Sequence, residues 1–420
     1  MLTKIFLLGA ATFALLHTGE ALVARLEDVP NPCKTTGMKP FDYSQLLCMS
    51  VLFYEAQRSG ELPGDQRLTW RGDSALKDGS DVGHDLTGGY FDAGDFVKFG
   101  FPMAFSTTLL AWGLIDFSNG YSSAGQTNHG KAAVKWATDY FLKCHTGHYE
   151  FYGTELAGET AAALAAAYMV FKFANEKRGS YSDSIPEVKD FYKSWNGFGD
   201  ELLWAAAWLY RATGDTTYLD KAKEHWDEFD LGDPPTEFSW DSKAPGAYAV
   251  LALATGNDLY KNTLKTCLDN MRHDLPYTPA GLVFVNDWGS NRHAANLAML
   301  AMVAGKLNID ASTNRQWAKK QIDYMLGDPL HSYVVGFGSN HPKKPHHASS
   351  SCPDMPEKCD PNWAMNQDGP NPQTLWGALV GGPSQDDSYS DSRPDYQHNE
   401  VACDYNAGFT GALAGLVEHH

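Results

Sequence analysis

Helical hydrophobic patterns recur in pairs along most of the chain and are separated by loops rich in Gly, Pro and Asp. The stretch 200–213 places Trp204 and Trp208 one turn apart and stops at Gly214, a residue type that commonly ends helices. Asp215 then has the position and chemistry of an N-cap for the following helix. Further helices are predicted over residues 159–174, 294–307 and 314–326. Because few segments alternate with period two, the pattern predicts an all-α chain.

The arrangement of these helices follows from how apolar they are. Several are apolar almost all round, which indicates burial inside a larger array of helices. About twelve helical segments are expected, and no fixed period of 34 or 40 residues marks them as a solenoid repeat. A long solenoid is the alternative, but helix hairpins without a strict repeat favour a closed ring of inner and outer helices.

The N-terminus has the pattern of a secretory signal peptide. Lys4 is followed by an apolar or small run over residues 5–16, and small residues at Ala21 and Ala24 suit cleavage. We therefore expect a signal peptide over residues 1–24 and a secreted mature protein. No Ser/Thr/Pro-rich linker or change of composition divides the remainder, so residues 25–420 are predicted to form a single domain.

Charge and aromatic content narrow the class of partner. The chain has 33 basic and 51 acidic residues, a formal net charge of −18. That balance argues against nucleic acid and against anionic membranes, which attract clustered Lys and Arg. Twelve Trp, twenty Tyr and twenty-one Phe suit stacking against sugar rings, although core filling is the commoner role of any single aromatic residue.

The seven cysteines give neither a disulfide scaffold nor a zinc pattern, since no Cys-x-x-Cys or paired His accompanies them. Cys352 and Cys359 lie in one Pro- and Asp-containing loop and are candidates for a local bridge. The odd number leaves at least one thiol that is free or intermolecular.

The densest polar segment is the predicted loop 68–102, which contains six Asp residues and seven Gly residues. Within it, Asp92 and Asp95 are separated only by Ala93 and Gly94. This spacing lets both carboxylates face one water molecule, and like charges so close raise at least one pKa. A calcium loop and a solvated acidic turn are equally compatible with this segment alone.

Two further loops carry candidate groups. Glu400 lies where the segment 386–406 leads into an apolar stretch, a setting in which a carboxyl acquires the raised pKa of a general acid. A Glu at a helix N-terminus favoured by the helix dipole is the simpler alternative. The segment 332–351 contains His341, His346 and His347, whose spacing lacks the i, i+4 arrangement of helical metal ligands.

Two long motifs resemble glycoside hydrolase family 9, the inverting endoglucanases that include animal digestive cellulases. The first is WRGDSALKDGSDVGHDLTGGYFDAGDFVKFGFPMAFSTTLLAWG, with the Asp-Ala-Gly-Asp motif of the family base. The second is YSDSRPDYQHNEVACDYNAG, which matches the family's other signature at every defined position: Tyr389, Asp391, Tyr396, Glu400, Ala402, Asn406 and Ala407. The resemblance spans nearly all the mature chain and implies an (α/α)6 barrel that acts on β-1,4-glucans such as cellulose.

The resemblance also implies residue roles. Asp95 matches the general base, Asp92 helps to hold the attacking water, and Glu400 matches the general acid. Five further residues match positions that line the sugar subsites. The resemblance implies catalytic roles for Asp391 and His346, and substrate contacts for Trp288, Arg292 and Tyr405. The segment 196–201 resembles a structural calcium site of some members, with Asp200, Glu201 and Asp241 as ligands. No cofactor is expected for the chemistry, and the protein is expected to be a monomer.

The chain departs from the family pattern at two places. Only Thr154 and Glu155 separate Gly153 from Leu156, where members normally carry a longer segment with a Trp-Gly-Arg-Pro-Glu-type motif of the substrate cleft. The second departure is Ala348, which stands where the Pro-His-x-Arg pattern has Arg. A catalytically impaired homologue that binds glucan is therefore the alternative to an active glucanase.

Overall fold

The computed structural model describes residues 31–147, 150–152, 168–354 and 357–419. The predicted signal peptide over residues 1–24 and the shortened junction between Gly153 and Leu156 lie outside the described residues.

Five helices form an inner row in the described part of the chain. They are α3 (Gly100–Asp116), α9 (Gly199–Thr213), α11 (Ala244–Thr255), α13 (Ser290–Lys306) and α17 (Cys403–His419). Helix α17 packs against α3 on one side and α13 on the other, and α11 contacts both α13 and α9. Nearly all residues of α13 and α17 are buried, as their all-round apolar patterns predict.

A second row of helices covers the first. It consists of α2 (Tyr43–Gln57), α5 (Thr127–Cys144), α10 (Thr216–Glu228), α12 (Asp258–His273) and α14 (Ala311–Leu326). Each packs mainly on one inner helix: α2 on α17, α5 on α3, α10 on α9, α12 on α11 and α14 on α13. Helices α5, α10 and α12 bury one face only, so they form the outer side of the helix pairs predicted from the sequence.

The remaining elements are short. They are α4 (Ser118–Ser123), β1 (His145–Gly147), β2 (Glu150–Phe151), α7 (Tyr168–Glu176), α8 (Tyr181–Ser184), the 3₁₀ helices η1 (Pro186–Asp190) and η2 (Ser349–Ser351), α15 (Pro361–Asn366) and α16 (Tyr396–Asn399). Strands β1 and β2 form an antiparallel pair, the one sheet among the described residues. Helix α7 contacts α9 and begins at Tyr168, within the range 159–174 in which the sequence predicts a helix; residues 159–167 of that range lie outside the described residues.

Helix ends follow the predicted capping chemistry. Gly214 ends α9 in the left-handed conformation at φ 71°, and the Asp215 carboxylate accepts the backbone amide of Thr217 at 2.9 Å to begin α10. The helix predicted over 294–307 begins earlier, at Ser290, because its first turn is buried against Gly381, whose carbonyl accepts the Asn291 amide at 2.9 Å.

The Cys352–Cys359 bridge predicted from the sequence is present. A second disulfide, Cys33–Cys48, ties the segment before α2 to that helix. Free buried thiols in the described chain are Cys144, Cys267 and Cys403.

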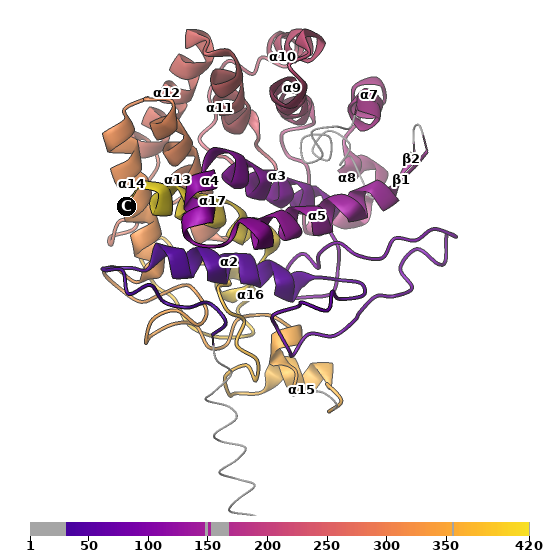
Figure 1. Cartoon of the computed structure of the whole chain (residues 1–420), viewed down its shortest axis with the longest axis vertical. Helices are drawn as coiled ribbons and strands as arrows, with labels where there is room; N and C mark the ends of the chain where they lie inside the picture. Colours follow the sequence, from indigo (N-terminus) through magenta and orange to yellow (C-terminus); the bar gives the residue numbers. More distant parts are fainter. Residues whose placement is uncertain (1–30, 148–149, 153–167, 355–356, 420) are drawn as a thin grey trace, which may run out of the picture.

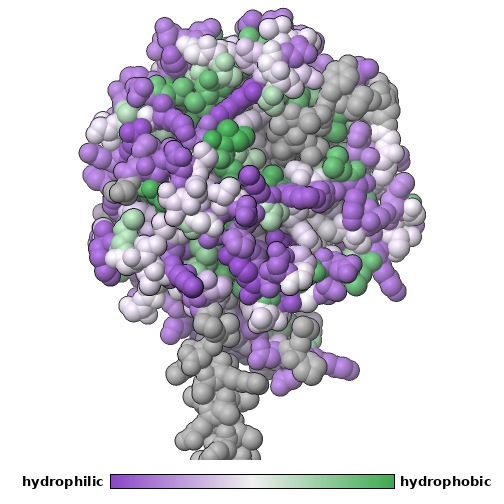
Figure 2. Space-filling view, viewed as in Figure 1, coloured by the Kyte–Doolittle hydropathy of each residue, from purple (hydrophilic) through white to green (hydrophobic). Residues whose placement is uncertain are grey.

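The loops that position the candidate site gather away from helices α9–α12. In Figure 1 the orange segment that carries α15, together with α16, lies at the end of the molecule opposite α10. Among the described residues, no helix combines the length and apolar character of a membrane span. The face in Figure 2 is mostly hydrophilic, with small separated apolar patches, since the large apolar side chains are used in the helix packing.

Candidate active site

The Asp-Ala-Gly-Asp loop is fixed at its start and turns its two acids in different directions. The Asp92 amide donates to the Val97 carbonyl at 2.9 Å, and the Asp92 carbonyl accepts the Cys403 amide of α17 at 2.8 Å. The Asp92 side chain is only 2% exposed, whereas that of Asp95 is exposed. Asp95 Oδ1 accepts the Val97 amide at 2.9 Å. The two acids are therefore suited to different tasks, Asp95 toward solvent and Asp92 behind it.

Gly94 allows the segment 332–351, which carries the three His residues and is called the His loop below, to pack directly on this acidic loop. Its carbonyl accepts the Ala348 amide at 2.7 Å. A Cβ atom on Gly94 would lie 2.1 Å from the His346 carbonyl oxygen, far inside van der Waals contact. Only glycine permits this approach, so the Gly of the Asp-Ala-Gly-Asp motif is needed for packing, whereas the two Asp residues are needed for chemistry.

Backbone contacts with the His loop and with Gly381 hold the segment of Glu400 in place. The His346 amide donates to the carbonyl of the preceding Asn399 at 2.8 Å, and the Gly381 amide donates to the Glu400 carbonyl at 2.9 Å. Burial and the nearby charge of Asp95 raise the pKa of Glu400 to about 8, against the opposing effect of the Gly94 amide. A carboxyl group with a pKa raised in this way has the property that the sequence analysis expects of a general acid.

Tyr192 is a site residue that the sequence motifs do not reveal. Its phenol donates to Asp92 Oδ2, and its ring packs against Phe99 and Trp240 at centroid distances of 4.9 Å. Asp92 Oδ1 is buried without a hydrogen-bond partner among the described residues. Burial and the charge of Asp404 raise the pKa of Asp92, while the Tyr192 hydrogen bond opposes that rise.

The buried side-chain amide of Gln57 supports the acidic loop. Gln57, the last residue of α2, donates through Nε2 to the carbonyls of Ala93 at 2.8 Å and Phe91 at 3.1 Å. Its Oε1 lies 2.8 Å from His347 Nε2, and His347 Nδ1 accepts the Ser350 amide at 3.0 Å. These contacts assign the proton to Nε2, and burial lowers the pKa of His347 to about 3. His347 is therefore a neutral support of the loop.

Asp391 lies in the site as a brace for the His loop. Its carboxylate accepts the backbone amides of Lys343 at 2.8 Å and Lys344 at 2.9 Å. His346 Nδ1 lies 2.7 Å from the Arg393 carbonyl, which assigns the proton to Nδ1. His346 Nε2 is then the nitrogen able to contact a ligand.

The three predicted substrate contacts differ in exposure: Trp288 is exposed and lies beside a further exposed ring, Tyr396, whereas Arg292 and Tyr405 are buried. Trp288 and Tyr396 are 46% and 53% exposed, with ring centroids 5.5 Å apart. Arg292 is buried: its guanidinium donates to Asp404 Oδ2 at 3.0 Å and to the Trp288 carbonyl at 3.0 Å, and it lies 5.0 Å over the Tyr405 ring. Trp288 and Tyr396 thus form the accessible apolar surface, and Arg292 and Tyr405 lie beneath it.

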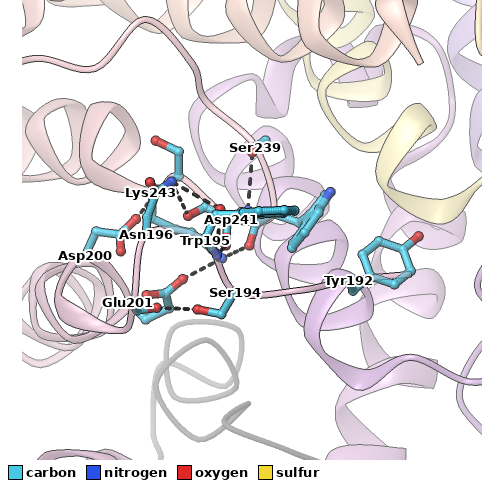
Figure 3. A network of polar contacts seen from close by, with 12 residues as sticks. Tyr192, Ser194, Trp195, Asn196, Asp200, Glu201, Ser239, Asp241 and Lys243 are labelled. Atoms are coloured by element: carbon cyan, nitrogen blue, oxygen red, sulfur yellow. Dashed lines mark hydrogen bonds and ion pairs between the residues drawn. The ribbon is translucent and has the colours of Figure 1, made fainter. Parts of the chain in front are cut away.

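The three acids expected at the calcium site lie together in one polar network (Figure 3). The network includes Lys243, whose ammonium lies 3.0 Å from Glu201 Oε1 and whose backbone amide donates to Asp200 Oδ2 at 2.6 Å. Asp241 accepts the Trp195 amide at 3.0 Å. Among the described residues, no three His, Cys, Asp or Glu side chains converge as ligands of one ion.

The chemistry of these donors nevertheless suits a cation. Glu201 Oε2 is buried without a hydrogen-bond partner among the described residues. Burial raises the pKa of Glu201 well above its usual value and that of Asp241 to about 7. These raised pKa values mean that the buried carboxyl groups resist ionisation beside the single ammonium of Lys243, and a calcium ion bound there would favour their ionised form.

The family model described as "Glycosyl hydrolase family 9" matches residues 43–154 and 148–413 of the chain. The two matched stretches meet at residues 148–154, beside the junction of Gly153 and Leu156. Together they contain every candidate site residue named above.

Relatives with known structures share the fold. Endoglucanase from the termite Nasutitermes takasagoensis is 51% identical with a TM-score of 0.88, covering 90% of this chain and 99% of that one. Endoglucanase CelQ from Clostridium thermocellum, solved with cellobiose and cellotriose, is 34% identical with a TM-score of 0.79, covering 90% of this chain and 71% of that one.

Curated relatives include Endoglucanase 14 of Arabidopsis thaliana, 37% identical over 90% of this chain and 94% of the relative. Endoglucanase B of Cellulomonas fimi is 40% identical over 97% of this chain, which spans only 45% of that longer relative. The latter alignment runs over 477 positions, more than the 420 residues of this chain, so the relative has segments that this chain lacks. The matches establish the predicted (α/α)6 barrel. The chain therefore belongs to glycosyl hydrolase family 9 and is a glycoside hydrolase.

Proposed function

We propose that the protein is a secreted endo-β-1,4-glucanase that hydrolyses cellulose or related glucans with inversion at the anomeric carbon. One observation carries this proposal: the raised pKa of Glu400, about 8, beside the exposed carboxylate of Asp95. An acid that holds its proton next to a solvent-facing carboxylate is the pair that glycosidic hydrolysis requires.

In the proposed reaction Glu400 gives its proton to the glycosidic oxygen as the bond to the anomeric carbon breaks. Asp95 takes a proton from water, and the hydroxyl that remains attacks the anomeric carbon from the opposite face. The leaving sugar gains the proton of Glu400, and the new reducing end gains the hydroxyl. The two residues exchange protons with solvent before the next turnover. Inversion requires their carboxyl groups to be about 6.5–9.5 Å apart during the reaction, which leaves room for the water.

Asp92 is proposed to assist the attacking water from behind Asp95. The Tyr192 phenol occupies Asp92 Oδ2, and Oδ1 is the oxygen left to accept a hydrogen bond. A water held between Oδ1 and Asp95 would be oriented before it attacks, which lowers the entropic part of the barrier.

The substrate is proposed to lie along the exposed aromatic pair. Trp288 and Tyr396 offer apolar ring faces to the faces of glucose units. Asp287, next to Trp288, accepts the Gln397 amide at 2.7 Å. It lines an open hollow of about 450 Å³ together with Phe284 and polar residues of the segment 384–388. Carboxylate and amide groups beside an aromatic surface suit the hydroxyl groups of a β-1,4-glucan.

The two disulfides, Cys33–Cys48 and Cys352–Cys359, support the proposal of secretion, because such bridges persist in oxidising compartments. Both bridges are local, with sequence separations of 15 and 7 residues, and each would restrain the segment that it closes.

A glucan-binding homologue with impaired catalysis is a second candidate, favoured by one contact. Ala348 hydrogen-bonds to Gly94 of the catalytic loop, so the Arg of the family pattern would begin beside Asp95. The loss of that charge affects the reacting centre more directly than it affects the Trp288–Tyr396 surface.

Release of reducing ends from carboxymethylcellulose, measured beside binding of cellotetraose by calorimetry, separates the two candidates. The glucanase proposal predicts release above that of a Glu400→Gln control, with binding retained in both proteins. Binding with no release above the control would establish the impaired homologue, and absence of both would refute a glucan substrate.

A further inference from the structure

Asp404 lies beneath the active site and is not part of the two-carboxylate mechanism. It is in the first turn of α17, and its side chain is 0% exposed. Arg292 Nη1 of α13 donates to its Oδ2 at 3.0 Å, while Oδ1 is buried without a hydrogen-bond partner among the described residues. Burial raises the pKa of Asp404, and the charge and hydrogen bond of Arg292 oppose that rise, so the Arg292 contact is a condition of keeping this carboxylate ionised.

Arg292 connects this buried carboxylate to the substrate surface. Its Nη2 donates to the Trp288 carbonyl at 3.0 Å, and its guanidinium lies 5.0 Å over the Tyr405 ring. Both terminal nitrogens of the guanidinium are therefore held in place, Nη1 by the Asp404 carboxylate and Nη2 by the backbone carbonyl of Trp288. Loss of either contact would alter the position of the cation below the site.

The Asp404–Arg292 pair is surrounded by titratable groups from several parts of the chain. Those influenced by the charge of Asp404 are Tyr54 of α2, Asp92 of the acidic loop, Tyr192, and the neighbouring Glu400, Cys403 and Tyr405. Glu400 also faces Asp95. Two of these groups, Asp92 and Glu400, belong to the proposed reaction.

The two members of the pair act on Glu400 with opposite sign. The Asp404 carboxylate raises the pKa of Glu400, and the Arg292 guanidinium lowers it. Asp404 also raises the pKa of Asp92, for which it is the strongest charged neighbour. An Arg292 without Asp404 would place an uncompensated positive charge beneath the general acid and favour loss of its proton.

We propose that Asp404 is a positioning residue: its buried carboxylate anchors Arg292 and offsets the guanidinium charge, so that Glu400 keeps the proton it must deliver. This inference rests on the proposed function, in which Glu400 is the general acid. Asp404 can have this role without touching the sugar.

The test compares Asp404→Asn, Arg292→Gln and the double variant by the titration of Glu400. Carboxyl-¹³C-labelled glutamate reports that titration, and Glu400→Gln assigns the signal. Asp404→Asn is expected to move the midpoint down by about one pH unit, because Arg292 keeps its charge. In Arg292→Gln the unpaired Asp404 is expected to take up a proton, so this variant and the double variant both lose the two charges, and both midpoints are expected above that of Asp404→Asn.

A matched control is Asp116→Asn. Asp116 is the last residue of α3, and the substitution breaks its ion pair with Arg211 and removes a similarly buried carboxylate. It is expected to lower the melting temperature without moving the Glu400 midpoint. If Asp404→Asn does not fold, Asp404→Ser takes its place, because its smaller side chain leaves room for water beside the guanidinium. A midpoint of the Asp404 variant equal to that of the wild type, or equal to that of the double variant, would refute the inference.

The pH profile of kcat, measured on the same proteins, separates this inference from the function on which it rests. An active wild-type enzyme whose alkaline limb follows the Glu400 midpoint in each variant supports both. An active enzyme with an unshifted midpoint refutes the role of Asp404 alone. Shifted midpoints in a protein that releases no reducing sugar refute the proposed function and retain the electrostatic coupling.

Discussion

The backbone amide of Ala348 donates to the carbonyl of Gly94 at 2.7 Å, so the residue that departs from the family's Pro-His-x-Arg pattern touches the loop that carries Asp95. An arginine at this position would begin within reach of Asp95 and Glu400. A charge-assisted contact of this kind contributes roughly 1.5–3 kcal/mol, which corresponds to tenfold or more in rate if it forms in the transition state.

Ala348→Arg is therefore expected to raise kcat/KM on cellotetraose about tenfold or more. Ala348→Met is the matched control, because it adds a side chain of similar reach without charge or hydrogen-bond donors. Equal activity of the Arg and Met variants would show that the missing guanidinium does not limit catalysis, and would direct attention to the shortened segment near Gly153.

The pH dependence of hydrolysis follows from the protonation of Glu400. Its folded-state pKa, about 8, lies above the usual value of a carboxyl group, so the proton is present below pH 8 and is lost as the pH rises through that value. Activity on cellulose is expected to fall as the pH rises through the same value, which gives the pH profile an alkaline limb near pH 8. A limb at the usual pKa of glutamate, near 4.3, would contradict this assignment.

Glu400→Gln tests the role of the same residue without a pH change. The amide cannot protonate a leaving oxygen, so hydrolysis of cellulose is expected to fall by about 10²-fold or more. Substrates with an activated aryl leaving group need no protonation and are expected to be hydrolysed with a smaller loss. Equal losses on both kinds of substrate would argue that Glu400 is not the general acid.

Gln57 is predicted to be needed for the geometry of the acidic loop. Gln57→Leu leaves the carbonyls of Ala93 and Phe91 and the His347 ring without their partner, and each buried unpaired group costs about 1–3 kcal/mol. Both the melting temperature and kcat are expected to fall. The matched control is Gln321→Leu, which removes a buried amide that serves the hairpin at Gly281 and Val283, and it is expected to lower stability alone. Similar kcat values for the two variants would contradict a role of Gln57 in catalysis.

The sequence predicted the inner and outer helices because their apolar patterns depend only on local periodicity. The helix ends at Gly214 and Asp215 followed from capping chemistry, and the acids Asp92, Asp95 and Glu400 lay in motifs. Tyr192 and Gln57 belong to no motif, and they reach the acidic loop only through packing between segments distant in the chain. The exposure of Asp95 beside the burial of Asp92 likewise depends on α17, whose Cys403 amide fixes the loop.

The depth of Arg292 is a second feature that the sequence did not indicate. Its match to a sugar-subsite position gives no information on burial, and the residue is on α13, whose first turns are buried against the loop at Gly381. Burial required a carboxylate partner, and Asp404 supplies it from α17. Pairing between two helices more than 100 positions apart is invisible to local patterns.

Calcium binding at Asp200, Glu201 and Asp241 is proposed and has a direct test. Incubation with EDTA is expected to lower the melting temperature, and added Ca²⁺ to restore it, because an ion bound only to the folded state stabilises that state. The control is the variant Glu201→Gln, whose melting temperature is expected to respond less to EDTA. An unchanged melting temperature would mean that Lys243 alone neutralises these carboxylates.

The central claim, that Asp95 activates water for attack on a β-1,4-glucan, is tested most directly by the rate at which Asp95→Asn hydrolyses cellotetraose. The amide cannot accept the proton from water, and general base catalysis contributes about 10²–10⁴-fold. We predict less than about a hundredth of the wild-type rate with an unchanged melting temperature, while Asp81→Asn, an exposed acid of the same polar segment, keeps the wild-type rate. A folded Asp95→Asn protein that retains a rate close to that of the wild type would contradict the account.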